Sequence, residues 1–183
     1  MKVRRVATGH DKSKAVFASD DEVDPVVLTL MPGTEFHILW GGDEPPDFPD
    51  AGASGSAVDG RSYFPPIGGY RFGLVTIPPA GTQPRSDLDI SEALAEMERD
   101  LPGMLAHAEP DDPGMHTTDT IDFEVVLEGT VVLELDDGAE VRLSPGDTVV
   151  QNGTRHRWRN PGDTTARIAV FMCGASHSAV PAG

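Results

Sequence analysis

The sequence contains almost no cysteine: Cys173 is the only one among 183 residues. A single thiol rules out an internal disulfide framework and a zinc site built from several thiolates. Long apolar runs are absent as well, so no segment is long enough to cross a bilayer, and residues 1–13 lack the apolar stretch of a secretory signal. These absences predict a cytoplasmic protein without a membrane segment.

Basic residues are also scarce. The chain has 14 Lys and Arg against 30 Asp and Glu, which gives a net charge of −16. This charge repels the phosphates of nucleic acids and the headgroups of anionic lipids, so neither is expected as a partner, although the acidic excess can also serve solubility alone. Gly and Pro are abundant, with 20 and 16 residues, and such frequent turn residues favour many short strands over long helices.

The N-terminal part predicts strands followed by a long loop. Residues 2–8 and 15–18 flank a polar turn and predict a hairpin, and residues 26–30 and 34–40 predict two further strands. Residues 41–69 are rich in Pro, Gly, Ser and Asp and form either a covering loop or a partly disordered segment. Three large apolar side chains are candidates to anchor this loop: Phe48, Tyr63 and Phe64.

One helix is predicted over residues 89–101, where Asp89 and Glu92 form a capping box and apolar residues recur at helical spacing. This helix either covers the mouth of a barrel or packs on its outside. Residues 123–174 alternate short strand-like runs with turn signals, which is typical of a β-sandwich or barrel. The chain is therefore predicted to be one domain, residues 1–183, divided into N-terminal strands (1–40), the loop (41–69), a barrel that includes the helix (70–174) and a tail (175–183).

Two motifs in the second half carry the chemistry. Asp122 and Gly129 follow His116 at the spacing of the pattern H-x-H-x(3,4)-E-x(6)-G, with Thr118 at the second His position and Asp122 at the Glu position. A second run resembles G-x(5)-P-x-G-x(2)-H-x(3)-N but is one residue shorter, with Gln151 in place of the Pro; its matching residues are Gly146, Gly153, His156 and Asn160. Both patterns resemble those of the cupin family, and the chain is similar to single-domain proteins described as cupin-domain oxidoreductases.

This resemblance implies an all-β cupin jelly-roll barrel with extra N-terminal strands and one short helix. It also implies a divalent metal, Fe, Mn or Zn, held by His116, Asp122 and His156, while the loss of a His at Thr118 leaves open a site without metal. Cupins commonly dimerise through N-terminal strands, so a homodimer is the expected assembly, with those strands packed on one sheet or exchanged with a partner.

The residue types fit such a site on physical grounds. Strand side chains alternate, so His116 and Thr118 share one face, as do Asp122 and Glu124. Two imidazoles and a carboxylate with open positions suit Fe(II), Zn(II) or Mn(II). Asp122 is either a ligand or a partner that fixes a His tautomer. Glu124 is either a catalytic acid or base with a raised pKa, or a side chain that points to water.

Other polar residues were weighed for the same pocket. Candidates for its wall are Thr118, Gln151, Trp158 and His37, with a core or structural role as the alternative for Trp158 and His37. Arg157 and Arg159 alternate away from His156 and predict ion pairs with nearby carboxylates. Asn160 is expected to cap a turn. The remaining histidines are expected at the surface: His10, His107 and His177.

These features predict an enzyme that acts on a small organic molecule. The preferred version is a metal-dependent oxidoreductase of an aromatic or polyketide-like substrate, with Glu124 moving protons. A metal-dependent isomerase, decarboxylase or cyclase is the alternative within the same site, because one fold hosts many chemistries. A non-catalytic cupin that binds a small ligand is the alternative of another class, and the Thr at position 118 favours it.

Overall fold

The computed structural model describes residues 2–49 and 61–178. In this part the strands are β1 (Val3–Asp11), β2 (Lys14–Val23), β3 (Val26–Val27), β4 (Glu35–Gly42), β5 (Tyr70–Ile77), β6 (Thr120–Glu128), β7 (Val131–Glu134), β8 (Glu140–Leu143), β9 (Thr148–Gln151), β10 (Arg157–Arg159) and β11 (Ala166–Gly174). The helical elements are α1 (Ile90–Asp100) and the short 3₁₀ turns η1 (Leu105–His107) and η2 (Asp136–Gly138).

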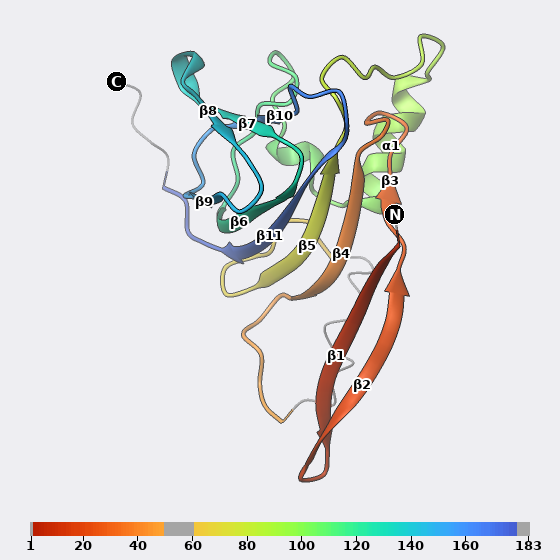
Figure 1. The fold of residues 1–183 in the computed structure, drawn as a ribbon, viewed down its shortest axis with the longest axis vertical. Helices are drawn as coiled ribbons and strands as arrows, with labels where there is room; N and C mark the ends of the chain where they lie inside the picture. Colours follow the sequence, from red (N-terminus) through yellow and green to blue (C-terminus); the bar gives the residue numbers. More distant parts are fainter. Residues whose placement is uncertain (1, 50–60, 179–183) are drawn as a thin grey trace.

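The strands build two antiparallel sheets and a separate hairpin. The larger sheet has the order β3-β4-β5-β11-β6-β9, and the smaller sheet has the order β10-β7-β8. Strands β1 and β2 pair with each other and project from the larger sheet (Figure 1). From β6 onward the chain crosses repeatedly between the sheets, with β6, β9 and β11 in the larger sheet and β7, β8 and β10 in the smaller one. Two facing antiparallel sheets connected in this way are consistent with a jelly roll, and the predicted fold class is confirmed.

An apolar core fills the space between the two sheets. It combines buried residues of β6 and β11 from the larger sheet with residues of β7 and β8 from the smaller one: Val126, Val131, Leu133, Leu143, Ala166 and Ile168. Burying one such side chain contributes roughly 1.5–3 kcal/mol. Trp158 of β10 packs against this cluster, so the core alternative holds for that residue.

Most predicted strands are present, with one clear exception. The predicted hairpin is confirmed and is longer than expected, because β1 and β2 pair from Val3 opposite Val23 to the turn. Of the strand predicted over residues 26–30, only the first two residues form a strand, which is β3, and the prediction for the rest is wrong. There the backbone turns instead, with the Met31 N–H donating to the Leu28 carbonyl at 3.1 Å and the Thr34 N–H to the Met31 carbonyl at 3.1 Å.

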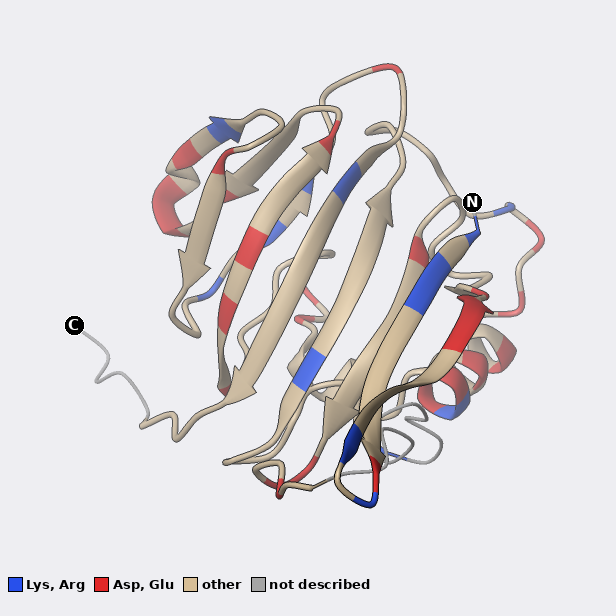
Figure 2. Ribbon diagram, turned by 60° about the horizontal axis from the view of Figure 1, so that its bottom comes forward, with Lys and Arg blue, Asp and Glu red and all other residues tan. Residues whose placement is uncertain are grey.

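Helix α1 begins where the capping pattern predicted. The Asp89 carboxylate accepts a hydrogen bond from the Glu92 N–H at 3.1 Å, which satisfies one free donor of the first turn. The helix buries Met97 against Phe36 of β4, on the same side of the larger sheet as the apolar core. This placement favours the first of the two predicted positions, at the mouth of the barrel. Acidic residues are frequent along α1 and again in η2 (Figure 2).

The ends of the long loop are fixed to the barrel by a buried arginine. Arg71 of β5 is 2% exposed and donates to the Gly42 carbonyl at 2.8 Å, to the Ser62 carbonyl at 2.8 Å and to the Asp43 carboxylate at 2.6 Å. The middle of the loop, residues 50–60, lies outside the described residues. None of the described helices is long and apolar enough to span a membrane.

Two of the three predicted loop anchors are confirmed. Tyr63 packs edge-on against Phe36 with ring centroids 5.7 Å apart, and Phe64 packs against Tyr63 at 4.9 Å. The Tyr63 N–H also donates to the Pro102 carbonyl at 2.8 Å. Phe48 is 70% exposed, so its predicted anchoring role is wrong.

Candidate active site in the barrel interior

Strand β6 directs two acidic side chains into the space between the sheets. Asp122 and Glu124 are only 4% and 8% exposed, whereas Phe123 between them is 47% exposed on the outer face. Successive side chains of a strand point to opposite faces. The predicted polar inner face of this strand is therefore confirmed, and the alternative in which Glu124 points to water is wrong.

Three buried polar atoms on this face have no hydrogen-bond partner among the described residues: Asp122 Oδ1, Glu124 Oε2 and Gln151 Nε2. Asp122 lies directly opposite Gln151 across β6 and β9, and Cβ atoms of such a pair are about 5 Å apart. Glu124 follows Asp122 on the same face, about 7 Å along the strand. An unsatisfied buried polar atom costs roughly 1–3 kcal/mol, so three together mark a place where a ligand can complete the hydrogen bonds.

The orientation of Gln151 is set by a neighbouring hydroxyl. The Thr154 hydroxyl donates to Gln151 Oε1 at 2.6 Å. The amide oxygen is therefore occupied, and the Nε2 donor is the atom left to face the carboxyl groups. This hydrogen bond therefore fixes the direction in which the Gln151 amide donates beside Asp122 and Glu124, the group of residues called the interior site below.

The two carboxyl groups differ in how tightly they hold a proton. Burial, and after it the negative charge of Asp122, raises the pKa of Glu124 to about 8. Burial raises the pKa of Asp122 to about 6, while the Thr120 hydroxyl acts in the opposite direction. Between these pH values the pair carries one proton. An acid and a base on one face are the arrangement expected for proton transfer.

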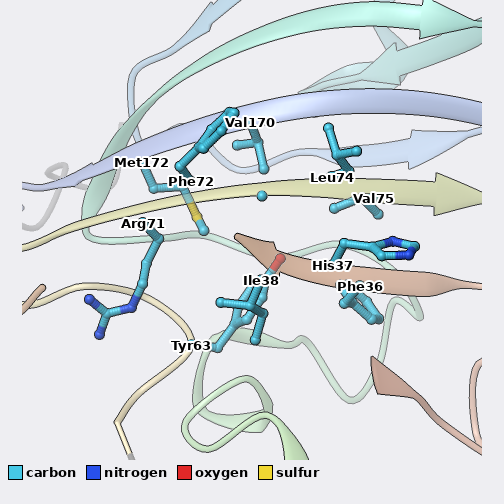
Figure 3. A pocket seen from close by; sticks show the side chains of 11 residues that line it. Phe36, His37, Ile38, Tyr63, Arg71, Phe72, Leu74, Val75, Val170 and Met172 are labelled. Carbon is cyan, nitrogen blue, oxygen red and sulfur yellow. The ribbon is translucent and has the colours of Figure 1, made fainter. Parts of the chain in front are cut away.

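A narrow pocket adjoins the carboxyl groups (Figure 3). Val170 and Met172 of β11 line it, and they are the cross-strand partners of Glu124 and Asp122. Tyr63 lines the pocket from the long loop. Burial, together with the negative charges of Asp122 and Glu124, raises the pKa of the Tyr63 hydroxyl, which therefore stays protonated. The pocket has room for about one water molecule, so a larger ligand requires the loop to move.

The two motif histidines are paired neighbours: His116 lies shortly before β6, and His156 lies directly before β10. The backbones of His116 and His156 exchange two hydrogen bonds, both 3.0 Å, and the ring centroids are 4.2 Å apart. Each Nδ1 lies within hydrogen-bond distance of a carbonyl, that of Gly114 at 3.0 Å and that of Thr154 at 2.8 Å. A carbonyl only accepts, so each Nδ1 carries the hydrogen and each Nε2 is an acceptor.

Both imidazoles are neutral near pH 7. Burial lowers the pKa of His116, and burial together with the charge of the neighbouring His116 lowers the pKa of His156 to about 4. A neutral ring whose Nδ1 is bound to a carbonyl is the form in which histidine ligates metals. A metal site here would need a third ligand, which the sequence predicted to be Asp122.

The predicted metal site does not fit this arrangement. Among the described residues, no three His, Cys, Asp or Glu side chains lie where they could hold one metal ion. Asp122 follows His116 by six residues, a distance of up to about 20 Å in extended chain, and it faces Gln151 instead of the imidazoles. Thr118, which replaces the second His, is 1% exposed and accepts a hydrogen bond from the Thr120 hydroxyl at 2.9 Å.

The arginines near His156 are committed to ion pairs, as predicted. Arg157 and Arg159 both donate to Glu134, each with a contact of 2.9 Å. These hydrogen bonds, above all the one from Arg157, lower the pKa of Glu134 to about 2. Arg155 donates to Glu109 at 2.7 Å. Further carboxylate partners of the three arginines are Asp112, Asp136 and Glu140. All three arginines are therefore engaged by carboxylates of the same chain.

His107 lies elsewhere than predicted, and His37 matches its predicted place in the pocket wall only in part. His37 of β4 is buried and contributes to the pocket lining, but its ring lies on the opposite side of the strand from Phe36 (Figure 3). His107, expected at the surface, is half-buried because η1 folds it against Phe64 at 4.7 Å, with its Nδ1 2.8 Å from the Thr117 carbonyl. The exposed positions of the other two histidines are confirmed: His10 and His177.

Asn160 has the turn-capping role that its sequence position predicted. Its side-chain amide donates to the Ile77 carbonyl at 2.9 Å and to the Thr164 carbonyl at 2.7 Å, and its side-chain oxygen accepts from the Gly162 N–H at 2.9 Å. It therefore joins the turn before β11 to the end of β5. The residue is structural and lies outside the carboxyl site.

Tyr63 is the pocket residue whose place in the site the sequence did not indicate. The sequence suggested only that it anchors the loop. The available signal was an aromatic pair, Tyr63 and Phe64, directly before two prolines in a segment otherwise poor in large side chains. That pattern marks a contact point but not which site it contacts.

The two facing sheets and the buried carboxyl groups on the inner face of β6 define a jelly-roll β-barrel protein with two acidic side chains inside. Residues 104–172 match the family model of the cupin domain, which supports the resemblance of the two sequence motifs to those of the cupin family. This segment contains both histidines and the whole of β6.

Curated relatives match only short stretches of this chain. Oryzines biosynthesis cluster protein J of Aspergillus oryzae (strain ATCC 42149 / RIB 40) is 43% identical over 61 residues, which are 33% of this chain and 34% of that protein. The cupin-domain-containing oxidoreductase fogC of Aspergillus ruber (strain CBS 135680) is 41% identical over 46 residues, 25% of this chain and 23% of that protein. The chain thus matches about a third or less of the length of these curated relatives.

A solved structure, that of a predicted oxalate decarboxylase from Thermotoga maritima, is similar over 83% of this chain and 93% of that chain. Its sequence identity is 13% and its TM-score is 0.44. We draw nothing about function from this likeness.

Proposed function

We propose that this protein is an enzyme that binds a small organic molecule between its two sheets and moves a proton on it. The observation that carries the proposal is the group of three unsatisfied buried atoms on Asp122, Glu124 and Gln151. Such atoms are costly in the absence of a ligand, and two of them belong to carboxyl groups that differ in proton affinity. The reaction class is therefore isomerisation, or a related proton-driven cyclisation.

In this mechanism the roles follow from the protonation states. Glu124 gives its proton to a carbonyl oxygen of the substrate, while Asp122 takes a proton from the adjacent carbon, whose C–H electron pair becomes a C=C bond. The Gln151 N–H donates to the oxygen on which charge develops. Where the adjacent carbon carries a hydroxyl, the intermediate is an enediol. Asp122 then returns its proton to the former carbonyl carbon, while the hydroxyl on the adjacent carbon gives its proton to Glu124 and becomes the new carbonyl, which restores both carboxyl groups. General acid–base catalysis of this kind contributes about 10²- to 10⁴-fold.

Proton exchange from a panel of small ketones and hydroxyketones in D₂O tests the proposal. NMR detects deuterium at the carbon beside the carbonyl. We expect the wild type to accelerate exchange in at least one compound and Glu124→Gln to lose about 100-fold or more of that rate. Glu128→Gln is the matched control, since Glu128 lies on the same strand but is exposed. Equal rates in wild type and Glu124→Gln contradict the proposed role.

An oxidoreductase is the second candidate function. It is favoured by the name of one relative, which is called a cupin-domain-containing oxidoreductase and matches 25% of this chain. Oxidation of a substrate alters its mass by two hydrogens, or by added oxygen, whereas isomerisation leaves the mass unchanged. Mass spectrometry of the products therefore separates the two candidates.

We also propose that the protein forms a homodimer. The outer face of the larger sheet supports this, because Phe123, Phe171 and Phe72 lie side by side on neighbouring strands and are 47%, 39% and 40% exposed. Few residues on these central strands are charged (Figure 2). Exposed apolar patches of this kind often mark protein interfaces. Phe17 on the projecting hairpin is 80% exposed and adds to the apolar surface.

A further inference from the structure

The interior site has carboxyl groups but no basic side chain to balance them. Among the described residues, Arg71 is the only Lys or Arg that is buried. Its guanidinium nitrogens are all engaged, with the carbonyls of Gly42, Ser62 and Tyr70 and with the Asp43 carboxylate. Arg71 therefore holds the loop ends together and offers no free donor to a ligand beside Asp122.

The nearest other basic groups are equally unsuited to bind an anion there. The guanidinium groups of Arg155, Arg157 and Arg159 are held by carboxylates. The rings of His116 and His156 lie side by side, and the Nδ1–H of each ring already donates to a backbone carbonyl. A carboxylate or phosphate that entered the site would lose its water without gaining a positive partner, which is strongly unfavourable.

The unsatisfied atoms also define which groups a ligand must present. Gln151 Nε2 is a donor and requires an acceptor, while Asp122 Oδ1 is an acceptor and requires a donor. Because the two residues are cross-strand partners, their side chains can reach two oxygen atoms that are close together in one small molecule. A carbonyl oxygen suits Gln151, and a neighbouring hydroxyl suits Asp122.

The rest of the adjoining pocket is mainly apolar. Val170 and Met172 border the carboxyl groups from β11, and Tyr63 and Phe36 form the wall towards the loop. Such a surface accepts a hydrocarbon or aromatic group by the hydrophobic effect. Arg71 is the one Lys or Arg that also lines this pocket, and its guanidinium nitrogens are already engaged by the loop ends and Tyr70.

From these contacts we infer that the site selects an uncharged hydroxycarbonyl compound, with a hydroxyl group beside its carbonyl, and rejects carboxylates and phosphates. This inference rests on the proposed function, because it names the substrate class of the same site. It goes beyond that function in assigning the carbonyl to Gln151 and the hydroxyl to Asp122.

Three small probes test the inference by ligand-detected NMR titration at pH 7. Acetoin carries the hydroxyl and the carbonyl, 2-butanone lacks the hydroxyl, and lactate carries a carboxylate in place of the ketone. We expect acetoin to bind about tenfold more tightly than 2-butanone, the ratio that corresponds to about 1.4 kcal/mol for one hydrogen bond to a charged group. Lactate is expected to show no saturable binding to the wild type.

Two near-isosteric variants assign the contacts. Asp122→Asn removes the negative charge and is expected to admit lactate and to reduce the preference for acetoin at least fivefold. Gln151→Glu replaces the amide donor by an acceptor and is expected to weaken both neutral probes about tenfold. Gln83→Glu, at an exposed site, is the control for added charge. Thermal unfolding of each variant shows whether the fold is retained.

The outcomes separate this inference from the proposed function. If lactate binds the wild type as tightly as acetoin, and Asp122→Asn or Gln151→Glu changes that binding, the interior site stands and the selection for uncharged compounds is wrong. If none of the probes binds the wild type, or if binding is unchanged in both variants, the interior is not the ligand site and both proposals are wrong.

Discussion

Asp122 and Gln151 face each other across β6 and β9, and each has one buried polar atom without a partner among the described residues. In an ordinary cross-strand pair of this kind, the amide would donate to the carboxylate and satisfy both atoms. Here the Gln151 amide oxygen is occupied by Thr154, and the amide hydrogen remains available. The pair is therefore arranged for a third group placed between them, in agreement with the proposed ligand site.

The first prediction concerns the pH dependence of stability through Glu124. The pKa of this group is 4.5 in its ordinary state and about 8 in the folded protein. As the pH rises, the unfolded chain releases this proton at a lower pH than the folded protein does. The contribution of Glu124 to the free energy of unfolding therefore decreases between about pH 4.5 and pH 8, by up to about 1.4 kcal/mol per pH unit. Glu124→Gln, which mimics the protonated acid, removes this contribution.

Chemical denaturation of both proteins between pH 4.5 and pH 8.5 measures the effect. Glu124→Gln is expected to match the wild type near pH 4.5 and to be more stable than the wild type at pH 8. The exposed Glu128→Gln is expected to follow the wild-type curve. A constant difference between Glu124→Gln and wild type across the whole range contradicts the raised pKa.

The second prediction concerns His156 and runs in the opposite direction. Its pKa falls from 6.5 to about 4 in the folded protein, so the unfolded chain takes up the proton first as pH decreases. Stability from this residue is present above pH 6.5 and is lost between about pH 6.5 and 4, again by up to about 1.4 kcal/mol per pH unit. His156→Asn, which retains a donor near the Nδ1 position, is expected to flatten the curve in that window.

The control for this prediction is His177→Asn, since His177 is exposed. We expect His156→Asn to be less stable than wild type at pH 7.5, because a buried ring is lost, and the difference to shrink as the pH approaches 4. Denaturation curves at half-unit intervals of pH provide the measurement. A difference that grows towards low pH would show that His156 is charged in the folded protein.

Local sequence patterns predicted most of the fold because its strands are bounded by strong turn signals. Among the short strands expected in residues 123–174, β9 lies between Gly146 and Gly153, and both glycines have positive φ. The strand prediction for residues 26–30 was wrong in part because apolar residues there, such as Leu28, are buried in a turn against α1. Burial makes a segment apolar whether or not its backbone is extended.

The site was only partly predictable, for a different physical reason. Strand alternation correctly placed Asp122 and Glu124 on the inner face. Alternation gives the face of a residue but not its distance from residues on other strands, so it could not show that Asp122 faces Gln151 and is not a third ligand beside His116. The contribution of Tyr63 depends on where a long loop returns to the barrel, which has no periodic signal.

The third prediction concerns Gly129, the last residue of the first motif. Its φ is +73°, and an added Cβ would lie 2.8 Å from both Cα and Cβ of Ala166. Gly129→Ala therefore combines an unfavourable backbone conformation with a steric clash and is expected to cost about 2–4 kcal/mol in the free energy of unfolding. Gly138 has a similar φ of +70° but no atom within 4 Å.

Gly138→Ala is accordingly the matched control, because it carries the backbone cost without the clash. We expect it to lose only about 1 kcal/mol. Urea denaturation at pH 7 compares the two variants with the wild type. Equal losses at both positions would show that the close approach of Gly129 to Ala166 is not what the motif glycine provides.

The last prediction tests the proposed homodimer at the outer face of the larger sheet. Phe171 is the best position, because it lies at the centre of the apolar row and its neighbours are Phe72 on β5 and Phe123 on β6. A stable interface usually buries about 800 Å² on each partner, and loss of a central aromatic side chain commonly costs more than about 2 kcal/mol of binding. Phe171→Ser is therefore expected to raise the dissociation constant at least about 30-fold while leaving the barrel folded.

Light scattering over a range of protein concentrations measures the mass of wild type, Phe171→Ser and the control Ile67→Ser. Ile67 is an exposed apolar residue outside this row. A wild type that stays monomeric at high concentration, or a Phe171→Ser variant that dimerises as well as Ile67→Ser, rules out this face as the interface.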